Sequence, residues 1–185
     1  MDEGVSEMKV SEDDILVATR DWFDDPQRAL SLLSEFLSNN PMSTRAKLRL
    51  AEIFSSGYGD GYSGAERLYR DILRVEPDHV LALSHMGLLH GAPGSTVSLE
   101  ESLRLLGLAA EISGETWALE NLGNKAWESL EYERAEIAFS RLEALAKSRD
   151  QLRLARTAAA SASNVRKRQK PDSLHYFVPE SNTKP

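Results

Sequence analysis

The chain has 185 residues, of which 41% are apolar and 28% charged, and it contains no cysteine. This length is enough for one domain with a sizeable core. The missing thiols exclude disulfide scaffolds, thiolate zinc sites and cysteine nucleophiles.

Hydropathy along the chain argues against membrane insertion. No apolar run approaches the roughly 18 to 20 residues that span a bilayer. Residues 1–10 are acidic and lack the apolar region of a secretory signal, and we expect them to be flexible. The sequence therefore predicts a cytoplasmic protein, or a nuclear one if the cell has a nucleus.

Charge is distributed unevenly along the sequence. The net charge of −7 combines 12 basic and 25 acidic residues in 1–140 with 9 basic and 2 acidic residues in 141–170. An acidic body disfavours nucleic acid as a partner, because phosphate binding needs cations along the contact surface.

Three segments taken in chain order show apolar residues at spacings of three and four, which predicts amphipathic helices. The first lies around Ala29, Leu30, Leu33, Phe36 and Leu37, the next around Ala65, Leu68, Tyr69, Ile72 and Leu73, and the last around Ala135, Ile137, Ala138, Phe139 and Leu142. Residues 39–41 (Asn-Asn-Pro), 76–78 (Glu-Pro-Asp) and 113–114 (Ser-Gly) interrupt the helices, since proline lacks an amide donor and glycine caps helix ends.

A repeat runs through these helices. A small residue followed four positions later by a large one occurs at Ala29/Leu33, Ala65/Tyr69, Ser102/Leu106 and Ala135/Phe139. The small residues are 36, 37 and 33 positions apart. A period near 34 predicts paired helices stacked in an array, because no pair can bury its own apolar face.

The order of residues within each unit resembles the tetratricopeptide repeat. The three clearer units are Leu50-Ala51, Phe54, Ala65, Tyr69, Ile72 and Pro77; Met86-Gly87, His90, Ser102, Leu106, Ala109 and Gly114; and Leu122-Gly123, Ala126, Ala135, Phe139 and Leu142. The weaker N-terminal unit has Leu16-Val17, Ala29, Leu33, Phe36 and Pro41. The resemblance covers residues 11–146 and implies an all-α fold, an α-solenoid of three to four antiparallel helical hairpins.

Two turns depart from this pattern. Residues 56–64 and 91–96 form longer connections than the family's usual turn, and the glycines of the first resemble those of the Sel-like repeat subclass. Residues 147–168, with a seam of Leu152, Ala155, Ala159, Ala162 and Val165, are expected to form a capping helix. Residues 169–185 are expected to be a flexible tail.

The resemblance implies a concave groove lined by the first helix of each hairpin. The side chains expected to face it, and to bind a peptide segment of another protein, are Arg45, Leu48, Arg49, Glu52, Leu81, Ser84, His85, Leu88, Trp117, Glu120, Asn121, Asn124 and Trp127. Guanidinium, amide and indole groups suit peptide recognition. The other interpretation is that some of them pack on the neighbouring repeat.

Other sites are disfavoured. The carboxylate clamp of some tetratricopeptide co-chaperones is not matched, because Trp117 and Asn121 stand where it needs basic residues. Residues 57–64 lack the Lys-Ser/Thr of a phosphate-binding loop, so a turn is expected. His85 and His90 are five apart, which does not align them for a metal. We expect no catalytic residue, no metal and no cofactor.

The basic stretch 166–170 (Arg166, Lys167, Arg168 and Lys170) is interpreted either as a solvated helix end or as a functional segment. The functional segment would be a nuclear import signal, or it would contact an acidic partner or nucleic acid. For the whole chain the leading hypothesis is a non-catalytic adaptor that binds a peptide. The alternatives are a chaperone for secreted proteins, resembling class II chaperones of type III secretion, and a helical accessory region resembling that of aspartyl β-hydroxylases. Self-association through the seam of 152–165 is a further possibility.

Overall fold

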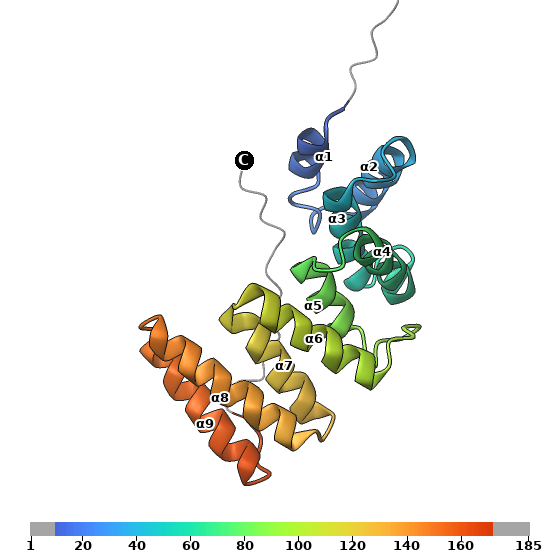
Figure 1. The fold of residues 1–185 in the computed structure, drawn as a ribbon. Helices are drawn as coiled ribbons and strands as arrows, with labels where there is room; N and C mark the ends of the chain where they lie inside the picture. The colour runs from blue at the N-terminus through green and yellow to red at the C-terminus, as the bar shows by residue number, and fades with distance from the viewer. Residues whose placement is uncertain (1–9, 172–185) are drawn as a thin grey trace, which may run out of the picture.

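The computed structural model describes residues 10–171, and that part of the chain is all-helical with no strand (Figure 1). The helices are α1 (Glu12–Ala18), α2 (Pro26–Asn39), α3 (Thr44–Ser55), α4 (Gly61–Val75), α5 (Val80–Leu88), α6 (Leu99–Ser113), α7 (Thr116–Glu128), α8 (Tyr132–Ser148) and α9 (Leu152–Arg166). The predicted all-α class is confirmed. The flexible ends predicted at 1–10 and 169–185 lie almost entirely outside the described residues.

Side chains at the helix ends explain where several helices begin. Ser11 and Asp14 form a capping box at α1, and the side chains of Asp25, Ser43 and Ser98 accept an amide of the first turn of α2, α3 and α6. Such caps satisfy amides that have no partner within the helix. Gly114 ends α6 with a φ of 60°, a conformation in which glycine meets no steric penalty.

The helices pack in chain order, each against the next, and Figure 1 shows α1 and α2 at one end of the molecule and α8 and α9 at the other. Helices α3, α5, α7 and α9 begin at residues 44, 80, 116 and 152, so successive starts are 36 residues apart. In addition, α1 contacts α3 and α5 contacts α7. Two pairs of odd-numbered helices therefore also touch, one in the first half of the array and one in the second.

The core consists of two clusters, one spanning α1 to α6 and the other α6 to α9. All four predicted pairs of a small and a large residue lie in the interior, with exposed fractions of at most 3%. The large member of one pair, Phe139 of α8, packs against Gly123 of α7, where an added Cβ would lie 2.9 Å from the ring. Glycine at this position lets α8 bring the ring against the backbone of α7.

Three expectations from the sequence were wrong in detail. The first long turn is shorter than predicted, because α4 begins at Gly61 and takes in Gly64, whose missing Cβ makes room for the Phe54 ring. Ile137 and Leu152 are 54% and 58% exposed, although both were placed on buried stripes. The buried face of α8 consists of Ala135, Ala138, Phe139, Leu142 and Ala146, and that of α9 consists of Ala155, Ala158, Ser161, Ala162 and Val165.

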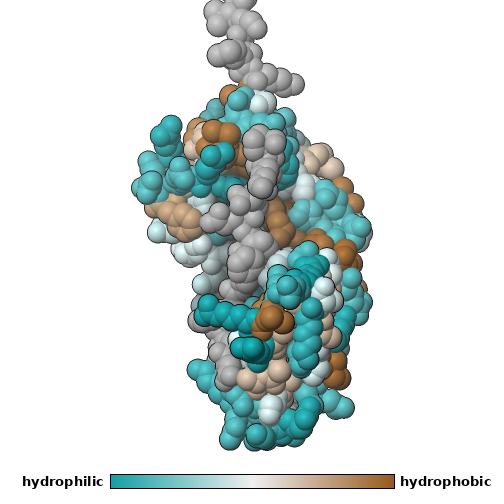
Figure 2. Space-filling view, turned by 90° about the vertical axis from the view of Figure 1, so that its left-hand side faces the viewer, coloured by the Kyte–Doolittle hydropathy of each residue, from teal (hydrophilic) through white to brown (hydrophobic). Residues whose placement is uncertain are grey.

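The remaining polar and apolar residues share the surface, where apolar side chains appear in separate patches among polar ones (Figure 2).

The second enlarged turn runs from residue 89 to 98, longer than the predicted 91–96. Helix α9 lies within the predicted capping range of 147–168, while α8 extends to Ser148. Within residues 10–171 no helix has both the length and the apolar character needed to cross a bilayer.

Candidate functional site

The side chains predicted to face a partner lie on α3, α5 and α7, and the structure brings α5 and α7 into contact. The Asn121 amide of α7 lies 3.5 Å from the Ser84 hydroxyl of α5. Lys125 of α7 donates to the backbone oxygen of His90, which follows α5, at 2.9 Å. Amide, hydroxyl and ammonium groups therefore join α7 to α5 and to the turn that follows α5.

The predicted residues separate into two groups by burial. Buried members have exposed fractions between 0% and 8%, and they are Leu48, Arg49, Ser84, His85, Asn121 and Asn124. Partly exposed members are Arg45, Glu52, Leu81, Leu88, Trp117, Glu120 and Trp127. Their role in binding a peptide stays a prediction, and the partly exposed group is the one with surface to offer.

Arg49 connects α3 to the end of α1. Its guanidinium donates to the backbone oxygens of Thr19 at 2.9 Å and Arg20 at 3.4 Å, and it pairs with Glu52 at 3.2 Å. The carbonyls at the C-terminus of a helix carry partial negative charge that a cation stabilises. Arg49 therefore holds the first hairpin onto the second.

Arg45 on the same helix has an analogous contact nearer the surface. Its guanidinium lies 2.7 Å from Asp13 and 3.2 Å from Glu12, both on α1. The side chain of Arg45 is 39% exposed, so solvent screens these pairs. A partner's carboxylate can compete for this guanidinium more readily than for the buried one of Arg49.

His85 lies buried at one end of a chain of three polar side chains. The Tyr69 hydroxyl is 3.1 Å from its Nδ1 and 3.3 Å from the Ser55 hydroxyl. Burial lowers the pKa of His85 to about 4 and raises the pKa of Tyr69. The imidazole is therefore neutral near pH 7, where it cannot act as a cation toward a ligand, and its Nε2 is buried with no hydrogen-bond partner among residues 10–171.

Aromatic side chains gather where α7 ends. The Trp127 ring meets the Tyr132 ring edge to face with centroids 5.2 Å apart, and the Arg168 guanidinium lies 4.1 Å from the centroid of Tyr132. Arg166 pairs with Glu136 at 2.7 Å. Two cations of the basic stretch 166–170 thus have partners within the chain, which fits the interpretation as a helix end.

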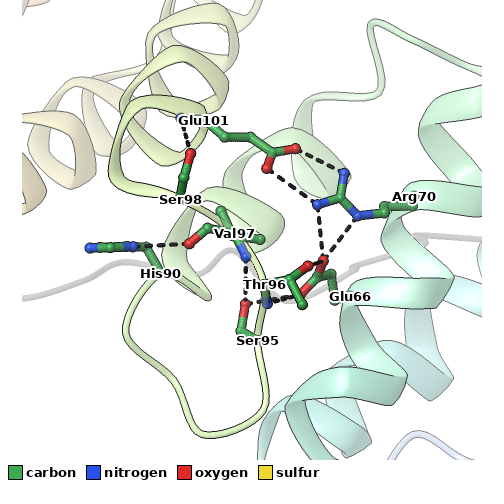
Figure 3. Close-up of polar contacts among 8 residues, drawn as sticks. All are labelled: Glu66, Arg70, His90, Ser95, Thr96, Val97, Ser98 and Glu101. Atoms are coloured by element: carbon green, nitrogen blue, oxygen red, sulfur yellow. Dashed lines mark hydrogen bonds and ion pairs between the residues drawn. The ribbon is translucent and has the colours of Figure 1, made fainter.

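A second polar cluster, shown in Figure 3, was not foreseen from the sequence. The Glu66 carboxylate of α4 accepts hydrogen bonds from the Thr96 amide at 2.7 Å, the Thr96 hydroxyl at 2.5 Å and the Ser95 hydroxyl at 3.0 Å. Arg70, one turn along α4, contacts Glu66 at 2.9 Å and donates to both oxygens of Glu101 on α6, at 2.8 and 3.2 Å. This cluster, the Glu66 latch, joins α4 to the turn before α6 and to α6 itself.

Electrostatics within the latch favour the charged carboxylate. Burial acts to raise the pKa of Glu66, but the bonds from Thr96, Arg70 and Ser95 together outweigh it and lower the pKa to about 2. Glu66 and Arg70 are four residues apart, a spacing that pairs charges on a helix. The contact with Thr96, thirty residues away, has no signal in the sequence.

A pocket of about 240 Å³ lies beside the latch and includes Arg67, Arg70 and Arg74 of α4 in its lining. Each of these cations already has a carboxylate within 3 Å, provided by Asp60, by Glu66 and Glu101, and by Asp71. An incoming anion would have to displace them, so the pocket offers little for anion binding. In residues 10–171 no group of three or more histidines and carboxylates is arranged to hold a metal.

Comparison with models of known protein families gave no match, and comparison with curated proteins gave none either. The geometry must therefore carry any functional statement. It offers contacts between helices, charges paired within the chain and two partly exposed indoles on α7, those of Trp117 and Trp127.

Proposed function

We propose that the chain is a non-catalytic protein-interaction module, a short α-solenoid of tetratricopeptide-like hairpins that binds a peptide segment along α3, α5 and α7. The observation that carries this proposal is the side-by-side placement of α5 and α7, joined at Ser84 and Asn121, with Trp117 and Trp127 partly exposed on α7. Aromatic anchors of this kind dominate the energetics of protein recognition.

The regular interval between helix starts supports the solenoid part of the proposal. Helices α3, α5 and α7 start 36 residues apart, and Gly87 and Gly123 are each the site where a large side chain of the following helix meets the backbone. A repeated contact of one kind builds an extended surface rather than an enclosed pocket. Extended surfaces take up peptides more readily than small molecules.

The test uses the tryptophans as reporters. Peptides selected on the purified chain from a random library are titrated into ¹⁵N-labelled protein, and the indole N–H signals of Trp22, Trp117 and Trp127 are followed by NMR. We expect the two α7 indoles to shift while Trp22, buried beside α1, does not. A selected peptide that moves only the Trp22 signal places the binding surface elsewhere and contradicts the proposal.

Substitutions then measure the contribution of the anchors. Trp117→Ala and Trp127→Ala should each weaken the binding affinity for the selected peptide about tenfold or more. This corresponds to a loss of roughly 1.4 kcal/mol or more in binding free energy, which is typical of an aromatic anchor. Ile112→Ala on α6 is the matched control, because Ile112 is 47% exposed and lies on a different helix. Equal affinities for all three variants and the unchanged protein would exclude this surface.

A further inference from the structure

The two ends of the helical array carry opposite charge. Residues 10–28, which include α1 and the start of α2, contain six Asp and Glu and two Arg. Residues 152–170, which include α9, contain six Lys and Arg and no acidic residue. Figure 1 places these segments at opposite ends of the molecule, so the uneven charge of the sequence becomes a separation in space.

The acidic end also exposes aromatic surface. Phe23, 70% exposed, is the most exposed large apolar side chain in residues 10–171, and Val17 is 62% exposed. The Phe23 ring stacks on Trp22 at 3.8 Å, and Tyr58 meets Trp22 edge to face at 6.1 Å. These four residues are called the aromatic end.

Carboxylates surround the aromatic end. A pocket of about 260 Å³ beside Trp22 and Val17 is lined in addition by three carboxylates, Asp21, Asp24 and Asp25, and by one cation, Arg28. Apolar surface with polar residues at its rim is typical of an interaction site, and the excess of three carboxylates over one guanidinium favours a partner with cations beside apolar groups.

Helix α9 presents the complementary surface. Its buried side packs on α8 through Ala155, Ala158 and Ala162, so the small-residue seam is not the surface it offers to another molecule. Leu152, 58% exposed, lies next to Arg153 and one turn before Arg156, both of which are exposed. No residue in the described part of the chain forms an ion pair with Arg153 or Arg156. Leu152, Arg153 and Arg156 are called the basic end.

We propose that the aromatic end of one copy binds the basic end of a second copy, so that the chains associate head to tail. Guanidinium groups are attracted both to the carboxylates and to the faces of aromatic rings, and Leu152 adds apolar surface. A contact between two different surfaces leaves one of each free, so association continues with rising concentration.

The first measurement is the molar mass by light scattering across a range of protein concentration. We expect the mass to rise above the 20.6 kDa of one chain at about 0.1 M salt and to fall back toward it at about 1 M salt, where charges are screened within about 3 Å. A molar mass that stays at that of one chain at every concentration overturns the proposal. This holds even if a basic peptide from another protein binds the aromatic end.

Two variants and their matched controls locate the surfaces. Phe23→Lys and Arg156→Glu should each reduce the association constant between chains at least tenfold. Met42→Lys, at a residue 68% exposed in the turn after α2, and Arg104→Glu, on an exposed face of α6, should leave it unchanged. Circular dichroism checks that all four keep their helices, and Val17→Lys replaces Phe23→Lys if the latter does not fold. Controls that weaken association as much as the test variants contradict the assignment.

Mixing the two variants separates head-to-tail contact from symmetric dimers. Phe23→Lys keeps an intact basic end and Arg156→Glu keeps an intact aromatic end, so the mixture has one working contact. We expect the mixture to form a two-chain species and nothing larger, although each variant alone stays a single chain. A mixture in which no two-chain species forms rules out the head-to-tail arrangement. This result is independent of peptide binding at α7, because neither substitution touches Trp117 or Trp127.

Discussion

Glu66→Gln should destabilise the protein markedly, although it preserves the shape of the side chain. The carboxylate accepts three hydrogen bonds from Ser95 and Thr96 and two contacts from Arg70. An amide has one acceptor oxygen, so part of this set is left unsatisfied. The pKa, lowered from 4.5 to about 2, corresponds to about 3 kcal/mol favouring the charged form. We therefore expect a loss of about 3 kcal/mol in the free energy of unfolding at pH 7.

The assay is urea unfolding followed by circular dichroism at a series of pH values. Since the folded protein lowers the pKa of Glu66, its contribution is fully present above about pH 4.5 and is lost as the pH falls toward about 2. The difference between the unchanged protein and Glu66→Gln should therefore shrink across this range. Amide exchange at Thr96, whose N–H donates to Glu66, should quicken in the variant at pH 7.

Glu111→Gln, at an exposed residue of α6, provides the control and should change the stability by less than about 0.5 kcal/mol. A loss below about 1 kcal/mol for Glu66→Gln would refute the reasoning. A difference that stays the same from pH 7 to pH 2 would show that the charge is not its source.

Two further predictions concern the interior. Gly123→Ala places a Cβ 2.9 Å from the Phe139 ring and should lower the free energy of unfolding by about 1 to 3 kcal/mol, measured by thermal or urea unfolding. Gly107→Ala is the control, because a Cβ there has nothing within 4 Å, and it should be neutral or stabilising by up to about 1 kcal/mol. Equal effects of the two substitutions would contradict the close approach of α7 and α8. The fold keeps His85 neutral beside Tyr69 and lowers its pKa to about 4, whereas His85 of the unfolded chain takes up a proton near pH 6.5. The free energy of unfolding should therefore fall by about 3 kcal/mol as the pH drops from about 6.5 to about 4. His85→Gln should flatten the stability curve in this range, and an unchanged slope would place the titrating group elsewhere.

The helices themselves could be predicted from local patterns. Apolar spacing, the prolines and the capping residues depend on neighbours in the sequence, and the anchors such as Ala65 and Tyr69 are buried as predicted. The turn before α4 was harder to place. Gly64 looks like part of a loop in sequence, and only the approach of the Phe54 ring explains why a helical position carries a glycine.

The predicted site was less accessible to sequence reasoning. A helical spacing indicates which residues share a face, but not what covers that face. Arg49 and Trp127 were both placed in the groove, yet the guanidinium of Arg49 binds backbone oxygens at the end of α1 and the Trp127 indole remains partly exposed. The difference lies in contacts between residues far apart in the chain.

The sequence by itself determined the all-α class, the repeat near 34 residues and the division into an acidic body and a basic C-terminal segment, because composition and periodicity are local properties. Only the tertiary structure decided which charges are paired and which side chains are exposed. Glu66 meets Thr96, and Phe23 is left at one end of the array with Arg156 at the other. These facts depend on how one helix packs against the next, and that arrangement is set by side-chain shape across the whole chain.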